Sequence, residues 1–153
     1  MNLIKRINDL NLELPPAPKP VGVYKPILVI DNFLYISGQG PINTDGSLIT
    51  GKVGSDLNKN EAKLAARQVG LTMLSTIVNN FKNINQIKRI IKVFGMVNSD
   101  QEFFDHPYVI NGFSELMVEV FGEKMGIGVR SAVGMTLPQN IAVEIEAQFE
   151  INT

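Results

Sequence analysis

Hydrophobic and polar residues alternate most regularly near the C-terminus of the chain. From Val143 to Ile151 every second residue is apolar, and the residues between them are Glu144, Glu146, Gln148 and Glu150. A period of two predicts a strand with one buried and one exposed face. The preceding stretch, from Gly128, predicts another strand, and residues 137–140 (Leu-Pro-Gln-Asn) predict a turn because proline presets φ and asparagine tolerates unusual backbone angles.

Four further β-rich runs precede these strands. Residues 27–30 and 33–37 flank Asp31-Asn32 and predict a two-residue hairpin. A short strand is expected around Ser47 to Ile49. Residues 87–97 are apolar on both faces, which is typical of a central strand covered on both sides. If the helices cover only one face of the sheet, we expect oligomerisation to cover the other.

Helical periodicity appears in two places. Asn58 and Glu61 have the spacing of a capping box, and an apolar stripe follows from Ala62 to Phe81. The second helix is expected to begin at Asp105-His106-Pro107, with Asp105 as its cap, and to end at Gly122. We interpret His106 as a first-turn surface residue rather than a catalyst. The element order predicts an α+β fold, a mixed sheet backed by two helices through right-handed crossovers.

The N-terminal 20 residues differ from the rest. Residues 1–14 have the pattern of a short amphipathic helix, and residues 15–20 (Pro-Pro-Ala-Pro-Lys-Pro) must be extended, because proline lacks an amide hydrogen and disfavours helix before it. We interpret this segment as a strap along the surface. The remainder, residues 21–153, is interpreted as a single domain.

The composition of the chain excludes some classes of site and disfavours others. The chain has 153 residues, a net charge of −1, no cysteine and one histidine, which excludes disulfides and thiolate chemistry and disfavours histidine-based triads and metal sites. The chain has no excess of positive charge to attract the phosphate backbone, so a nucleic-acid partner is not expected. No apolar run reaches the length of a membrane span, and the first residues lack the uninterrupted apolar core of a signal peptide. We therefore expect a cytoplasmic protein with no membrane partner.

Arg130 is the most unusual charged residue. It lies among small or apolar residues, and burying an unpaired guanidinium costs several kcal/mol, on the order of the penalty for a desolvated ion. Its partner is either a glutamate of the neighbouring strand or the carboxylate of a ligand, and the sequence leaves both open. Because Arg130 and Glu144 are both even-numbered, pairing on one sheet face requires a loop of odd length or a bulge.

Several short motifs, taken in order, resemble the RidA (YjgF) family, also called endoribonuclease L-PSP. They are Tyr24, Ser37-Gly38-Gln39-Gly40-Pro41, Val109-Ile110-Asn111, Arg130-Ser131-Ala132-Val133, Leu137-Pro138 and Glu144-Ile145-Glu146-Ala147. The resemblance covers about residues 21–151. It implies a chorismate-mutase-like fold and a homotrimeric barrel with sites between subunits.

The resemblance also implies an activity. Members hydrolyse reactive enamine and imine intermediates of the 2-aminoacrylate type to 2-oxo acids and ammonia, without a cofactor or metal. By this resemblance Arg130 holds the substrate carboxylate, Glu144 positions the attacking water, and the remaining pocket residues are Tyr24, Ser37, Gly38 and Asn111. Two alternatives stay open: a non-catalytic sensor that binds small carboxylates at the same clefts, and an endoribonuclease or translation inhibitor, which the acidic balance disfavours.

Overall fold

Five strands form one mixed sheet in the order β1-β2-β5-β3-β4 in the computed structural model, which describes residues 1–152. The strands are β1 (Ile27–Ile30), β2 (Phe33–Gln39), β3 (Ile87–Asn98), β4 (Val129–Met135) and β5 (Val143–Ile151). β3 and β4 run parallel, and the other neighbouring pairs are antiparallel. The predicted α+β class and mixed sheet are confirmed.

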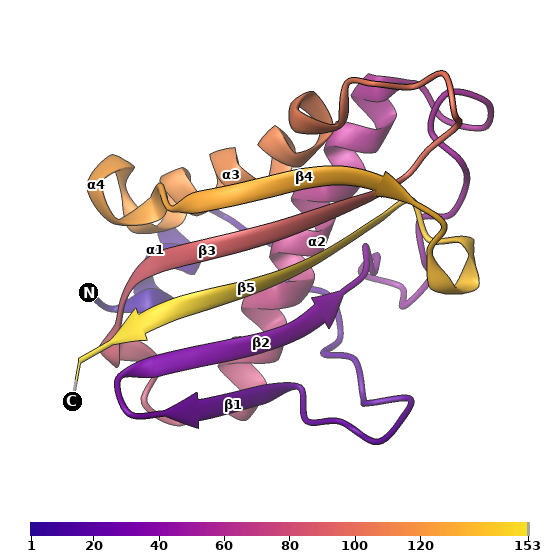
Figure 1. Cartoon of the computed structure of the whole chain (residues 1–153). Coiled ribbons are helices and arrows are strands. Elements are labelled where there is room, and N and C mark those ends of the chain that lie inside the picture. The colour runs from indigo at the N-terminus through magenta and orange to yellow at the C-terminus, as the bar shows by residue number, and fades with distance from the viewer. Residues whose placement is uncertain (153) are drawn as a thin grey trace.

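The helices lie on one face of this sheet (Figure 1). They are α1 (Leu3–Asp9), α2 (Lys59–Asn80), α3 (His106–Phe121) and α4 (Glu123–Gly126), with single turns of 3-10 helix at Ile84–Gln86 and Pro138–Asn140. α2 and α3 form the layer behind the sheet, and the face toward the viewer in Figure 1 carries no helix. The two predicted helices are confirmed, and one sheet face is left open.

Local signals placed several boundaries correctly. The capping box of α2 is present, with the Asn58 side chain accepting from the backbone N–H of Glu61 and the Glu61 side chain accepting from that of Asn58. Asp31 has φ 51° in the β1–β2 turn, and Gly122 ends α3 with φ 80°. Asp105 does precede α3, but its side chain makes no capping hydrogen bond, so that part of the prediction is wrong.

Three expectations need correction. β4 and β5 are consecutive in the chain but are not neighbours in the sheet, because the long apolar strand β3 lies between them and pairs with both. The segment Ser47–Ile49 forms no strand, and its residue Leu48 makes only an isolated bridge to Ile42. The N-terminal helix ends at Asp9, and Asn11 with φ 52° follows it.

The core lies between the helices and the inner face of the sheet. Its largest fully buried side chains include Phe113, Phe149, Leu34, Met73 and Ile110. Each contributes about 1.5–3 kcal/mol relative to an exposed position. On β5 the buried residues alternate with the glutamates and Gln148, as the period of two predicted.

The strap continues from the helical layer toward the open face of the sheet. Its start is fixed by the buried hydroxyl of Ser75 on α2, which donates to the carbonyl of Pro15 at 2.7 Å. Beyond this point the strap residues 18–20 and the following Val21 line a cleft described below. Among residues 1–152, no helix combines the length and apolarity needed to cross a bilayer.

Candidate functional site

Arg130 lies on the edge strand β4 and points toward the helices. It is in register with Val93 of β3, which is buried in the core between sheet and helices. Its Nη1 donates to Ser114 Oγ of α3 at 3.0 Å, and its Nη2 donates to the carbonyl of Pro107 at 3.3 Å. The guanidinium is therefore held along α3 by two neutral acceptors.

The surroundings of Arg130 differ from those expected. The side chain is exposed at the sheet edge, so its small neighbours do not bury it. No carboxylate in residues 1–152 lies within ion-pair distance of it, and the alternative of a glutamate on the neighbouring strand is wrong. Because a guanidinium has five N–H donors, several remain for an acid from outside the chain.

A depression of about 540 Å³, here called the Arg130 groove, lies between α3, α4 and the start of β4. Asn111 lines the groove together with Arg130 and Ser114. The same-face placement of Arg130 and Asn111 follows from the packing of β4 beside α3. Two of the six residues that the resemblance assigns to the site thus meet in one place.

Glu144 lies on the other side of the sheet. It pairs with Met96 of β3, and its neighbours Val143 and Ile145 point into the core, so Glu144 points to the open face. It lines a second depression of about 470 Å³, here called the Glu144 cleft. The pKa of Glu144 is raised above the usual glutamate value by burial first and by the nearby charge of Glu146 second.

A bulge in β2 places Ser37 and Gly38 opposite Glu146 and brings Gly38 next to Glu144. Ile36 pairs with Ala147 and Gln39 with Ile145, so two β2 residues stand opposite one β5 residue. A Cβ on Gly38 would lie 2.9 Å from Glu144 Oε2, so only glycine leaves the carboxylate its present place.

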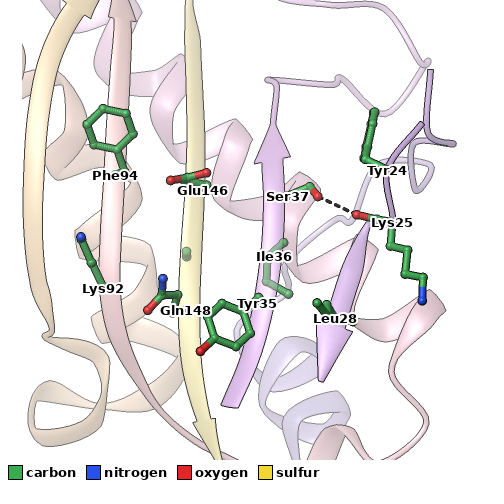
Figure 2. Close-up of a pocket in the computed structure, with 11 residues that line it drawn as sticks. Tyr24, Lys25, Leu28, Tyr35, Ile36, Ser37, Lys92, Phe94, Glu146 and Gln148 are labelled. Atoms are coloured by element: carbon green, nitrogen blue, oxygen red, sulfur yellow. Dashed lines mark hydrogen bonds between the residues drawn. The ribbon is translucent and has the colours of Figure 1, made fainter. Parts of the chain in front are cut away.

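Tyr24 closes the Glu144 cleft from the strap side. Its hydroxyl accepts from the backbone N–H of Val21 at 3.2 Å, and the Ser37 hydroxyl donates to the carbonyl of Lys25 at 2.6 Å. An adjoining pocket of about 390 Å³ on the open face shares Tyr24, Ser37 and Glu146 with the cleft. Figure 2 shows Glu146 on β5 between Phe94 of β3 and Ser37 of β2.

One chain therefore carries two half-sites. Asn111 and Arg130 line the Arg130 groove on the helix side, whereas Tyr24, Ser37, Gly38 and Glu144 line the Glu144 cleft on the open side. The first half offers a fixed cation with spare donors, and the second offers a half-buried carboxylate with a raised pKa. The cation suits binding an acid and the carboxylate suits deprotonating a water, but the two groups do not meet within one chain.

Other residues of the depressions were not assigned a role in the site from the sequence. Glu146 and Lys19 line the Glu144 cleft, and Ser114 holds Arg130. The alternation along β5 places Glu146 beside Glu144 and could have identified it. The contact of Ser114 with Arg130 depends on how α3 lies over β4, for which the sequence gives no local signal.

His106 lies outside both depressions. Its Nε2 is 3.0 Å from Ser99 Oγ, and its ring packs edge-on against Phe103. Burial lowers its pKa. Within residues 1–152, no cluster of three or more His, Cys, Asp or Glu side chains has the arrangement of a metal site.

Comparison with known proteins gives a consistent result. Residues 5–142 match the model of the family described as “YjgF/chorismate_mutase-like, putative endoribonuclease”. Protein TCP17 of Trypanosoma cruzi is 37% identical, over 95% of this chain and 92% of that protein. A 2-iminobutanoate/2-iminopropanoate deaminase of Dermatophagoides farinae is 23% identical, over 89% of this chain and 91% of that protein. The crystal structure of a “putative endoribonuclease” of Shewanella oneidensis has a TM-score of 0.91 at 27% identity, over 99% of this chain and all of that one.

Proposed function

Because this chain belongs to the YjgF/chorismate-mutase-like family, the RidA family, we propose that it hydrolyses reactive enamine and imine intermediates of 2-amino acids to 2-oxo acids and ammonia. The observation that carries this proposal is the pair of complementary half-sites, the Arg130 guanidinium free of carboxylate partners and the half-buried Glu144. The name of the deaminase relative supports the same general role.

The proposed site forms between two copies of the chain. The Arg130 groove of one copy faces the Glu144 cleft of the next, which joins the six residues that one chain keeps apart. Large apolar side chains remain exposed on the hairpin and the edge strand, among them Leu28 (43%), Ile30 (50%) and Val129 (66%). Burying them against further copies favours association, and a head-to-tail contact that closes gives a ring. The proposed assembly is the homotrimer that the family resemblance implies.

In the proposed reaction Arg130 fixes the substrate. A guanidinium and a carboxylate form two parallel charge-assisted hydrogen bonds, each contributing about 1.5–3 kcal/mol. Ser114 and the Pro107 carbonyl hold the guanidinium in place, so the orientation is set before the substrate arrives. Asn111 in the same groove is placed to contact the acid.

Glu144 then acts on a water. Its carboxylate takes a proton from the water as the water oxygen attacks the carbon of the protonated imine, which gives a neutral carbinolamine. Glu144 returns that proton to the nitrogen, and the C–N bond breaks with its electron pair on ammonia. The hydroxyl proton passes to the Glu144 carboxylate as the 2-oxo group forms, and it is available there to protonate the next imine. A pKa raised toward neutrality suits a group that takes and returns a proton. Atoms balance as imine plus water to 2-oxo acid plus ammonia.

The assay generates the imine in place. An amino-acid oxidase supplies 2-imino acids, semicarbazide competes for them, and 2-oxo acid release is followed with and without this protein. Faster release that is lost in Arg130→Ala and in Glu144→Ala supports the proposal. Binding of 2-oxo acids without any acceleration favours the non-catalytic sensor instead.

The endoribonuclease named in the family description is tested with the same variants. Its signature is RNA cleavage that survives extensive purification and disappears in Arg130→Ala. The net charge of −1 gives little attraction to a phosphate backbone. We therefore regard endoribonuclease activity as a weaker candidate function than imine hydrolysis.

A further inference from the structure

The Arg130 groove is apolar over most of its length. Val118 and Ile127 are the large apolar lining residues that reach the surface, whereas Val93, Phe113 and Met117 lie buried behind them in the core. Ile127 is 54% exposed, so a large apolar side chain meets water at the mouth of the groove. The volume of about 540 Å³ is within the range that holds a small organic ligand.

The polar groups of the groove are arranged at its edges. Glu115 is paired with Lys63 at 3.0 Å, and both oxygens of Glu119 accept from Arg67 at 2.8 and 2.9 Å. These two acids line the groove but are already paired with cations of α2. Among the lining residues that the structure describes, Arg130 is the one cation, and it has no carboxylate partner.

An unpaired cation beside an apolar channel suits an amphipathic acid. The carboxylate would lie on Arg130, and an aliphatic chain would lie along Val118 toward the exposed Ile127. A ligand with only a methyl group would leave this apolar surface in contact with water. Each methylene group that covers it is expected to strengthen binding by about fourfold.

We infer that the substrates of this site carry aliphatic side chains of several carbons, longer than the methyl group of 2-aminoacrylate-derived imines, and that the Arg130 groove receives this side chain. The inference rests on the proposed function, since it takes the same Arg130 as the carboxylate anchor. It goes further in naming the side-chain class and the residues, Ile127 foremost, that select it.

The test uses stable product analogues on the whole chain. Isothermal titration calorimetry measures the binding of unbranched 2-oxo acids with three to eight carbons. Affinity is expected to rise about fourfold for each added methylene until the groove is filled. In Ile127→Ser the rise per methylene is expected to be clearly smaller. In Leu64→Ser, which changes an exposed apolar residue of α2 outside the Arg130 groove and the Glu144 cleft, the whole series is expected to match the unmodified protein.

Failure of this inference is distinguishable from failure of the proposed function. If pyruvate binds, Arg130→Gln weakens it, and affinity does not change with chain length, the side-chain class is overturned while the proposed function stands. If affinity rises with length but Ile127→Ser leaves the slope unchanged, the chain lies elsewhere and the groove assignment is overturned. If no 2-oxo acid binds, or if Arg130→Gln does not change the affinity, both the inference and the proposed function are overturned.

Discussion

Arg130 and Glu144 project from opposite faces of one sheet, with β3 between their strands. Arg130 is level with Val93 and bonded to Ser114 of α3, whereas Glu144 is level with Met96 and points away from the helices. The two groups therefore cannot act on one small molecule within a single chain. This relationship is the reason why we propose a site shared between copies, and it allows each half-site to be tested separately.

Arg130→Lys is expected to lower catalytic efficiency by roughly ten- to hundredfold, because lysine keeps the charge but loses one of two parallel hydrogen bonds to the carboxylate. Stopped-flow or coupled assay of imine hydrolysis measures the loss. Thermal unfolding should change little, because Arg130 is exposed and forms no ion pair among residues 1–152. Lys88, paired with Glu150 far from both half-sites, supplies a control in Lys88→Gln. Full activity in Arg130→Lys would contradict the bidentate role.

Glu144→Gln is expected to lower the turnover by roughly 10²–10⁴-fold, the usual contribution of a general base. It should also raise thermal stability at neutral pH. The pKa of Glu144 is raised in the folded protein, so its ionised form is disfavoured there, and the unmodified protein loses stability as pH rises through that raised value.

The pH dependence of unfolding tests the effect of Glu144→Gln on stability separately from its effect on turnover. Below the ordinary pKa of glutamate the unmodified protein and Glu144→Gln should unfold at nearly equal temperatures, and a gap should open as pH rises toward neutrality. Calorimetric scans at several pH values measure this gap. Equal unfolding temperatures at every pH would show that burial does not act on Glu144. Glu13→Gln on the strap side of α1 serves as a control acid.

Gly38→Ala is expected to lower activity through Glu144 rather than through folding. The added methyl would lie 2.9 Å from Glu144 Oε2 and 3.0 Å from its Cδ, so the carboxylate must move. A double-mutant cycle measures the coupling. In a Glu144→Ala background, Gly38→Ala should cause little further loss, because the group it displaces is already gone. Additive losses would place the effect of Gly38 elsewhere.

The sequence predicts the parts of this protein whose signals are local. The capping box at Asn58, the turn at Asp31 and the alternation of β5 each depend on a few adjacent residues, and each is confirmed. The order of strands is not local. Nothing near Arg130 or Glu144 shows that β3 inserts between their strands, so the sequence left open an Arg–Glu pair that does not form.

The candidate site, too, is predicted only as far as its signals are local. The ordered motifs indicated six candidate residues, and in the structure two of them line the Arg130 groove and four line the Glu144 cleft. The burial of Glu144 and the attachment of Arg130 to Ser114 come from packing between elements far apart in the chain. The apolar neighbours of Arg130 suggested a buried guanidinium, but β4 is an edge strand and leaves it exposed.

The central claim, that one site takes Arg130 from one copy and Glu144 from another, is tested most directly by subunit complementation. Arg130→Ala and Glu144→Ala are each expected to be inactive. When the two are co-expressed in equal amounts and mixed oligomers are verified by native mass spectrometry, about one quarter of unmodified activity should return, because each site draws one residue from each of two copies taken at random. Mixed oligomers that stay inactive would contradict the account, because they would place both residues' action within a single chain.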